Sequence, residues 1–244
     1  MYSLNNIEMQ SMRNILQSPY MACAIRLVDK LKDSKNAFDE IYRILNESKS
    51  SVDDFLAERK KTGEIKDEKQ ALKSIAGNSF SKIIEYIFLK NKIIGNIRPD
   101  IFITSQKSKV PNFEEISTIK MGDETQKPDC DLVIYSLNKN NTLKKCMILS
   151  LKTSLRDNVK KIRNWKFLME IATSEKTIKE NFGINYTSKY TPLVCLAITD
   201  FYKINISKIK NKLIFFDKTF IADKINSNFI AKMSLLPNYV NDGL

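Results

Sequence analysis

The sequence predicts an α/β fold with a central mixed β-sheet flanked by helices and an N-terminal helical subdomain. Short apolar runs bounded by Asn, Lys, Pro and Gly predict strands in the last two thirds of the chain. Apolar residues at spacings of three and four predict helices in the first third. A long helical stretch between strands is typical of a sheet covered by helices. We therefore expect a helical subdomain over 1–72 and an α/β domain over 73–244.

The composition fits one substantial folded unit without a membrane span. The chain has 244 residues, of which 43% are hydrophobic, enough for one large core. Its longest apolar runs, such as 193–198, are far shorter than a membrane-spanning helix, and residues 1–6 lack the pattern of a signal peptide. The four cysteines are scattered and form no CxxC pair, as expected for buried thiols in a reducing compartment. We expect a cytoplasmic protein with no membrane partner.

The charge distribution predicts a polyanionic partner. The net charge is +12. Residues 1–72 hold twelve basic and twelve acidic residues, so the excess lies in 73–244, with 28 basic against 16 acidic. Lys and Arg that face phosphates release counterions, although a Lys- and Asn-rich genome would give a similar excess. Histidine is absent, which excludes HNH nuclease chemistry, Ser-His-Asp triads and histidine zinc sites. Any hydrolysis here must rely on carboxylates, lysine and a hard metal ion.

The first 93 residues predict helices. Apolar residues recur at helical spacing over 21–45, and a charged run containing a glycine suggests a boundary near 62–70. A second helical pattern over 73–93 is broken early by Gly77 and contains Glu85 within an apolar stretch. Taken alone, Glu85 is interpreted as a solvated glutamate on the polar face of this helix.

The remaining segments predict strands around one long helix, which we expect from about 155 to 173. Strands are predicted at 101–103, 116–121, 132–135, 147–152 and 193–198, and a late hairpin at 213–216 and 219–222.

Two of these strands carry the polar residues on which a catalytic site could be built. Asp129 and Asp131 come just before the strand at 132–135, and Ser150 and Lys152 end the next strand. Since side chains alternate along a strand, each pair shares one face. Pairing of the strands would bring a carboxylate and an ammonium group together at one edge of the sheet.

The helix after Lys152 is predicted to be capped and basic. Ser154 is a favourable N-cap with Asp157 three positions on. Backbone N–H groups at such a helix N-terminus favour phosphate. The basic residues of this helix are Arg156, Lys160, Lys161, Arg163 and Lys166.

This arrangement resembles the PD-(D/E)XK nuclease superfamily, and the run Lys152-Thr153-Ser154-Leu155-Arg156-Asp157 is similar to a signature of type II restriction endonucleases. The resemblance covers about 75–222 as a pattern of elements, and its specific residues fall within 128–157. It implies a restriction-endonuclease-like core that hydrolyses phosphodiester bonds of double-stranded DNA with Mg²⁺.

Phosphodiester hydrolysis needs a metal ion, an activated water and a group that stabilises the pentacovalent anion. We expect Asp131 to be the first metal ligand, because a carboxylate at the start of a strand is rigid and faces solvent. Asp129 is the second choice, and the Leu151 carbonyl could complete the coordination. Lys152 would orient or deprotonate the water, or stabilise the transition state. The alternative is a Pro-Asp turn and a lysine whose stem lines a strand, without catalysis.

Ser150 departs from the family pattern, which places Asp or Glu two residues before the lysine. Resembling enzymes with serine there recover a carboxylate about 13 or 14 residues after the lysine, where this chain has Trp165 and Lys166. Glu170 lies about one helical turn too far. Glu85 lies in the helix where many members of the superfamily carry an acid. Both are therefore carried as competing second ligands, and Ser150 is kept in the catalytic set.

The resemblance also implies which residues read DNA. In the resembling enzymes an Arg-(Asp/Glu)-Arg triplet at the start of the helix reads G·C pairs. The candidates here are Arg156, Asp157, Asn158, Lys160 and Arg163. The missing second arginine leaves the base preference open, and capping by Asp157 competes with base reading.

Together these features predict a type II restriction endonuclease of a restriction-modification system, which cuts double-stranded DNA at a short specific sequence with Mg²⁺ and no organic cofactor. A homodimer is expected, because two copies of one site most simply cut both strands of a two-fold sequence. Two alternatives stay open. One is a repair or recombination nuclease of the same fold that reads DNA structure. The other, suggested by Ser150, is a DNA-binding protein without catalysis.

Overall fold

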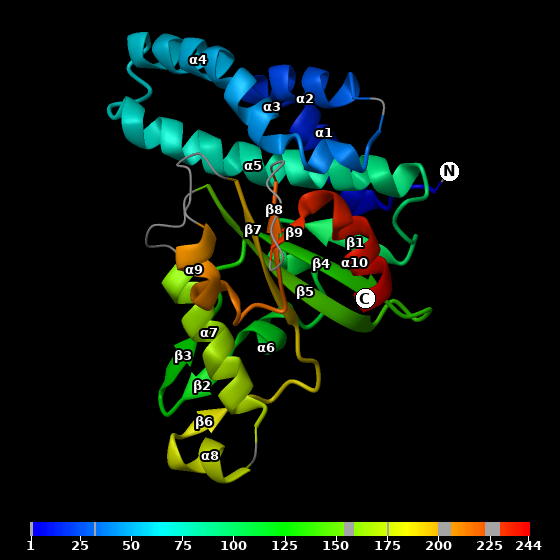
Figure 1. The fold of residues 1–244 in the computed structure, drawn as a ribbon, viewed down its shortest axis with the longest axis vertical. Coiled ribbons are helices and arrows are strands. Elements are labelled where there is room, and N and C mark those ends of the chain that lie inside the picture. Colours follow the sequence, from blue (N-terminus) through cyan, green and yellow to red (C-terminus); the bar gives the residue numbers. More distant parts are fainter. Residues whose placement is uncertain (1, 32, 154–158, 175, 200–205, 223–229) are drawn as a thin grey trace.

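The fold is a mixed β-sheet between two layers of helices, with a second, smaller sheet at one end (Figure 1). The computed structural model describes residues 2–31, 33–153, 159–174, 176–199, 206–222 and 230–244. The predicted α/β class, with a central mixed sheet flanked by helices, is confirmed. No helix in the described ranges combines the length and apolar character needed to cross a bilayer.

Among the described residues, six strands form the main sheet in the order β1-β4-β5-β7-β8-β9. The pairs β1–β4 and β4–β5 are antiparallel, whereas β5, β7, β8 and β9 run parallel to one another. Because β5, β7 and β8 run in the same direction, all three end at the same edge of the sheet. Parallel neighbours of this kind require crossover connections. Their bounds are β1 Ile101–Thr104, β4 Leu132–Leu137, β5 Leu143–Lys152, β7 Leu193–Ile198, β8 Lys218–Ile221 and β9 Ala231–Lys232.

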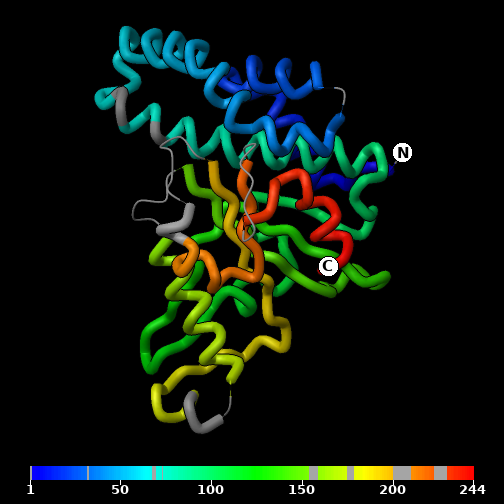
Figure 2. The backbone as a smooth tube through the Cα atoms, viewed as in Figure 1, coloured from blue at the N-terminus to red at the C-terminus, as the bar shows by residue number. Residues whose placement is uncertain are grey.

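The smaller sheet has the order β3-β2-β6 and lies at the end of the molecule remote from the N-terminal helices (Figure 2). The predicted strand at 116–121 is shorter in the structure, because 113–117 form a helix. The elements of this region are η3 Lys107–Lys109, α6 Phe113–Ser117, β2 Ile119–Met121, β3 Glu124–Gln126, α8 Lys176–Asn181 and β6 Ile184–Asn185.

Helices account for the first third of the chain, as predicted. The long helix α5 lies against the sheet, and α2, α3 and α4 form a layer on it (Figure 1). The bounds are α1 Asn6–Leu16, η1 Pro19–Met21, α2 Ala22–Asp29, η2 Asn36–Phe38, α3 Ile41–Glu47, α4 Lys49–Lys61 and α5 Glu68–Ile93; the later helices are α7 Val159–Ala172, α9 Ile206–Leu213, η4 Met233–Leu235 and α10 Leu236–Gly243.

Alternation along β5 builds one core on each face of the sheet. Leu149 and Leu151 pack with apolar residues of α5 and the N-terminal helices. Ile148 packs on the opposite face with Trp165 and Ile162 of α7. Successive side chains of a strand point to opposite faces, so Ser150 and Lys152 lie on the α7 side.

The predicted boundary at residue 72 falls inside α5. The core on the α5 side of the sheet joins the N-terminal helices to the sheet. The division of the chain at 72 stays a prediction.

Two local predictions were wrong. Gly77 does not break the second helical pattern, since α5 is continuous over 68–93; a single helical glycine costs only about 1 kcal/mol relative to alanine, and packing against the sheet outweighs it. The predicted late hairpin is absent from the described residues, because Leu213 ends the helix α9 and 218–221 form β8, which pairs in parallel with β7.

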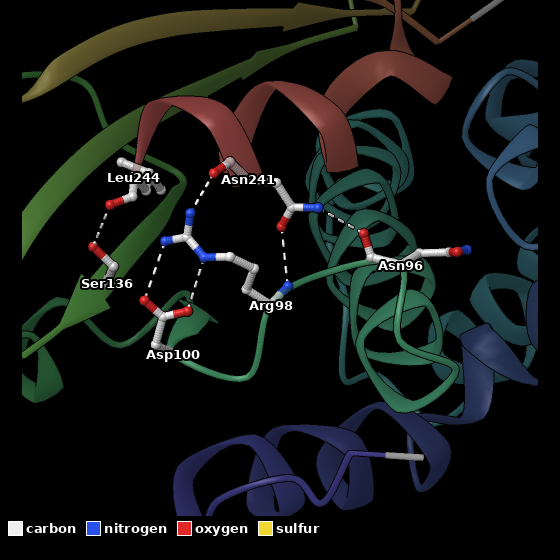
Figure 3. A network of polar contacts seen from close by, with 6 residues as sticks. All are labelled: Asn96, Arg98, Asp100, Ser136, Asn241 and Leu244. Atoms are coloured by element: carbon white, nitrogen blue, oxygen red, sulfur yellow. Dashed lines mark hydrogen bonds and ion pairs between the residues drawn. The ribbon is translucent and has the colours of Figure 1, made fainter. Parts of the chain in front are cut away.

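The last helix, α10, is held to the sheet by polar contacts that Figure 3 shows. The guanidinium of Arg98 pairs with Asp100 at 2.9 Å and also donates to the carbonyl of Asn241. The Arg98 backbone N–H donates to Asn241 Oδ1 at 3.0 Å, and Ser136 Oγ on β4 donates to the carbonyl of Leu244 at 3.0 Å. These bonds fix α10 beside β1 and β4, away from the edge where β5 ends.

A buried ion pair joins α1 to α5. Lys92 Nζ lies 2.6 Å from Glu8 Oε1, and both side chains are at most 1% exposed. Lys92 Nζ also lies 3.9 Å from the centre of the Phe102 ring. Burial raises the pKa of Glu8 and lowers the pKa of Lys92, so each charge depends on its partner to remain ionised.

We expect Lys92→Met to lower the free energy of unfolding by about 3 kcal/mol at neutral pH, because it leaves the Glu8 carboxylate buried without its partner. This loss of stability should become smaller as the pH falls, because protonation of Glu8 removes the unpaired buried charge. A carboxyl group whose pKa is raised in the folded state favours that state only when it is protonated. Urea denaturation at several pH values measures this. Arg43→Met is the matched control, because Arg43 pairs with Glu47 where both side chains are more than 40% exposed, and it should cost less than about 1 kcal/mol. Equal losses in the two variants would contradict the prediction.

Candidate active site

The predicted strand pair forms and brings Asp131 beside the end of β5. β4 and β5 are antiparallel, with Leu132 opposite Leu149. Just before β4, the Asp131 N–H donates to the carbonyl of Leu149 at 3.2 Å. The Asp131 carboxylate then accepts the Leu151 N–H at 2.6 Å. The carboxylate is thus fixed to the sheet edge by the backbone of β5.

Lys152 lies between the two aspartates. Its Nζ is 2.5 Å from Asp129 Oδ2 and 4.0 Å from Asp131 Oδ2. The lysine side chain is 9% exposed, whereas the Asp129 and Asp131 side chains are 34% and 37% exposed. An ammonium group is therefore held at the sheet edge by two carboxylates that solvent can reach. The juxtaposition that sequence alternation predicts is present in the structure.

A cavity of about 420 Å³ opens on the other side of Asp131, toward α5. Asp131, Leu151 and Thr153 line it from the sheet edge. The residues that α5 and the segment after β1 contribute were not predicted from the sequence to belong to the site, because they lie far from the motif along the chain. They are Ser74, Gly77, Asn78, Phe80, Ser81, Ser105 and Lys107, and Cys130 completes the lining.

Ser150 lies on the same face as Lys152 but does not reach the cavity. It is fully buried, and its Oγ has no hydrogen-bond partner among the described residues. The neighbouring strand places Leu196 of β7 opposite it. Ser150 therefore occupies a core position beneath Lys152, and its hydroxyl is closed off from solvent.

Glu85 is buried rather than solvated, so its interpretation as an exposed glutamate was wrong. It is 2% exposed, and Ser11 Oγ of α1 donates to its carboxylate at 2.5 Å. Burial raises the pKa of Glu85, while the Ser11 hydrogen bond and Lys82 oppose this effect. Its contacts tie α5 to α1, and it does not line the cavity at Asp131.

We expect Glu85→Gln to increase stability at about pH 8, because the amide keeps a hydrogen bond to Ser11 without the cost of burying a charge. The raised folded-state pKa means that wild-type Glu85 favours the folded state only when protonated, so the gain should fade as the pH drops toward the ordinary glutamate pKa. Thermal denaturation over this pH range measures it. Glu170→Gln, at a 61% exposed side chain, is the control and should change stability little. Loss of DNA cleavage by a stable Glu85→Gln protein would return Glu85 to the catalytic set.

Glu170 lies at the opposite end of the sheet from Lys152. Glu170 Oε1 is 2.7 Å from Lys166 Nζ, which is also 3.0 Å from Asp217 Oδ2. Asp217 accepts the N–H of Val194, near the start of β7. Lys152 pairs with Ile198, four residues further along β7, or about 13 Å at 3.3 Å per residue. The structure therefore does not bring Glu170 to the aspartates.

The α7 helix presents part of its predicted basic surface. Lys160 and Lys161 are exposed and Arg163 is partly exposed. Lys166 is only 6% exposed and pairs with acids, so it does not add to this surface. The hydrogen bonds and the two acids raise its pKa, against the effect of burial. The predicted cap and the candidates Arg156, Asp157 and Asn158 lie outside the described residues.

The donor atoms at the sheet edge suit a hard divalent cation. The carboxylates of Asp131 and Asp129 are oxygen donors, and Asn78, Ser81 and Thr153, whose side chains carry neutral oxygens, line the cavity beside Asp131. Within the described ranges, no three His, Cys, Asp or Glu side chains gather to hold a metal by themselves. Magnesium is typically held by one or two carboxylates, waters and substrate phosphates, so this donor set fits Mg²⁺ if DNA supplies further oxygens.

Comparison with known proteins identifies the family of this chain. The family described as BsaWI restriction endonuclease type 2 matches residues 109–238, which include β4, β5, α7, β7 and β8. No curated protein matches the chain. The matched region covers more than half of the sequence and contains the Asp129, Asp131 and Lys152 cluster. The chain therefore belongs to the BsaWI family of type 2 restriction endonucleases.

Proposed function

We propose that this protein is a Mg²⁺-dependent type II restriction endonuclease that cuts double-stranded DNA at a short specific sequence, as one part of a restriction-modification system in the cytoplasm. The observation that carries the proposal is the meeting of Asp131, Asp129 and Lys152 at the solvent-facing edge of the sheet, in a family of restriction endonucleases. We assign the nuclease domain to 73–244 and the helical subdomain to 1–72.

In this proposal the protein residues hold the site in place for PD-(D/E)XK-type chemistry. Asp131, anchored by the Leu151 N–H, and Asp129 would hold Mg²⁺, with the Leu151 carbonyl as a further donor. When bound, Mg²⁺ supplies positive charge that offsets the charge developing on the scissile phosphate. Lys152 holds or takes a proton of the attacking water, or stabilises the pentacovalent anion.

The ion pair between Lys152 and Asp129 sets the resting arrangement of this site. At 2.5 Å, the carboxylate fixes the position of the ammonium group and offsets its charge. A cation that draws on Asp129 would weaken this hold and leave Lys152 free to contact a phosphate or water. The ion pair with Asp129 therefore holds the Lys152 ammonium group next to the position where it would act on water or phosphate.

The DNA-binding surface includes Lys160 and Arg163 on α7, together with Arg156, Asp157 and Asn158. We propose that the protein acts as a homodimer, because one described site serves one strand and a two-fold DNA sequence needs two. Sedimentation velocity with and without DNA tests this assembly.

Digestion of plasmid DNA by the purified protein tests the function. We expect discrete fragments with Mg²⁺ and none when a chelator removes the metal. Sequencing the fragment ends gives the recognition sequence and the cut position. A smear, or nicking confined to branched DNA, would favour a nuclease that reads DNA structure. Intact DNA with salt-dependent binding would indicate a DNA-binding protein without catalysis.

A further inference from the structure

The cavity beside Asp131 has two unlike walls. The sheet wall carries the Asp131 carboxylate, and the opposite wall is the face of α5 that presents Ser74, Gly77 and Asn78. All three α5 residues are exposed, and a Cβ atom built on Gly77 would meet no atom within 4 Å. This face of α5 therefore presents short or polar side chains, which leave room for a ligand to approach the proposed catalytic edge of the sheet.

Lys107 is the cation of this cavity. It lies in η3, after β1, and is exposed; among the described residues its Nζ has no hydrogen bond or ion pair. Lys109, in the same turn, is also exposed but does not line the cavity. Such an unpaired ammonium in a polar cavity remains available to an anion that enters from solvent.

Lys107 and the Asp131 carboxylate line the same cavity, so an anion that enters it meets charges of both signs. A phosphate close to the two carboxylates would be repelled, whereas one further along the cavity would meet the ammonium. This favours a contact between Lys107 and a phosphate next to the scissile one.

We propose that the cavity between Asp131 and α5 is the path of the DNA backbone and that Lys107 is a positioning residue that binds a phosphate neighbouring the scissile phosphate. This inference rests on the proposed function and adds to it a DNA contact that lies outside α7. A backbone contact of this kind fixes the register of the duplex without reading its sequence. Placement of the scissile phosphate at Asp131 then depends on an anchor contributed by η3.

The salt dependence of DNA binding tests this role directly. Each phosphate neutralised by a lysine contributes about 0.9 to the slope of log K against log salt concentration. With a fluorescent duplex of mixed sequence and no divalent metal, we expect Lys107→Ala to lower the slope by about 0.9, and Lys109→Ala to leave it unchanged. Lys139→Ala is a distant control, because Lys139 is exposed in the turn between β4 and β5, at the other end of these strands.

A second variant tests the path by filling it. Since Gly77 has open space around it and helical backbone, Gly77→Leu should keep or raise the melting temperature while it weakens DNA binding at least about tenfold. Gly77→Ala, which adds one carbon to the same helix position, should bind nearly as the wild type does. Tight DNA binding by a folded Gly77→Leu protein would show that the duplex passes elsewhere.

The outcomes separate this inference from the proposed function. A wild-type protein that neither binds nor cuts DNA would refute the function itself. A wild-type protein that cuts DNA, together with a Lys107→Ala variant that keeps the full salt slope, would refute only the inference. Equal reductions in slope for Lys107→Ala and Lys109→Ala would also overturn it, because they would indicate a diffuse positive surface rather than a contact within the cavity.

Discussion

Lys152→Ala should lower the rate of DNA cleavage at least about 1,000-fold while it leaves DNA binding largely unchanged. The expected loss follows from removal of the charge that orients water or stabilises the transition state, for which deletions typically cost two to four orders of magnitude. Lys152 is 9% exposed and pairs with Asp129, so it offers little surface to DNA in the ground state. Single-turnover cleavage and fluorescence anisotropy measure the two quantities separately.

Lys144→Ala provides the matched control for this experiment. Lys144 is an exposed lysine near the start of the same strand, at the end remote from the aspartates, and its removal should leave the cleavage rate within about twofold of the wild type. Wild-type activity in a folded Lys152→Ala protein would remove this lysine from the mechanism. Loss of both binding and cleavage would instead indicate a role in holding DNA.

Asp131→Asn should abolish Mg²⁺-dependent cleavage to a similar extent and yet preserve the fold. Asparagine has the same shape and its Oδ1 can still accept the Leu151 N–H, which lies 2.6 Å from the carboxylate. It removes the negative charge that makes the site attractive to a hard cation. Without metal, the variant should bind DNA at least as tightly as the wild type, because one source of repulsion between the site and phosphate is gone.

A readout independent of cleavage completes this prediction. In the Lys152→Ala background, which should not cut, added Mg²⁺ is expected to tighten DNA binding, and the further change Asp131→Asn should remove that effect. Asp123→Asn, at an exposed acid in the turn between β2 and β3, is the control. Retention of the Mg²⁺ effect by the Asp131→Asn double variant would exclude this carboxylate as a metal ligand.

The part of the site that could be predicted is the part governed by local rules. Strand alternation and the short connection between β4 and β5 are enough to predict that Asp131 and Lys152 meet, because residues on paired strands have few possible registers. The same rules place Ser150 on the face of Lys152. They do not give its depth, which depends on how α7 covers that face.

The residues that were misjudged have partners far away in the sequence. Glu85 is buried because Ser11 of α1 supplies its hydrogen bond, and no local pattern connects residues 74 positions apart. Glu170 belongs to an ion-pair group with Lys166 and Asp217, so its helical spacing from Lys152 did not reveal which end of the sheet it occupies. Likewise, α10 is held in place by hydrogen bonds between Arg98 and Asn241, which are 143 positions apart in the sequence.

Because β5, β7 and β8 run in the same direction, the chain leaves all three at the edge that bears Lys152. Under the proposed function, changes of sequence or length where the chain leaves these strands would reshape the surroundings of Lys152 without altering the pairing of β5, β7 and β8, since connections between strands generally tolerate such changes. In the proposed function, the DNA sequence that is recognised could then change while Asp131 and Lys152 stay in place.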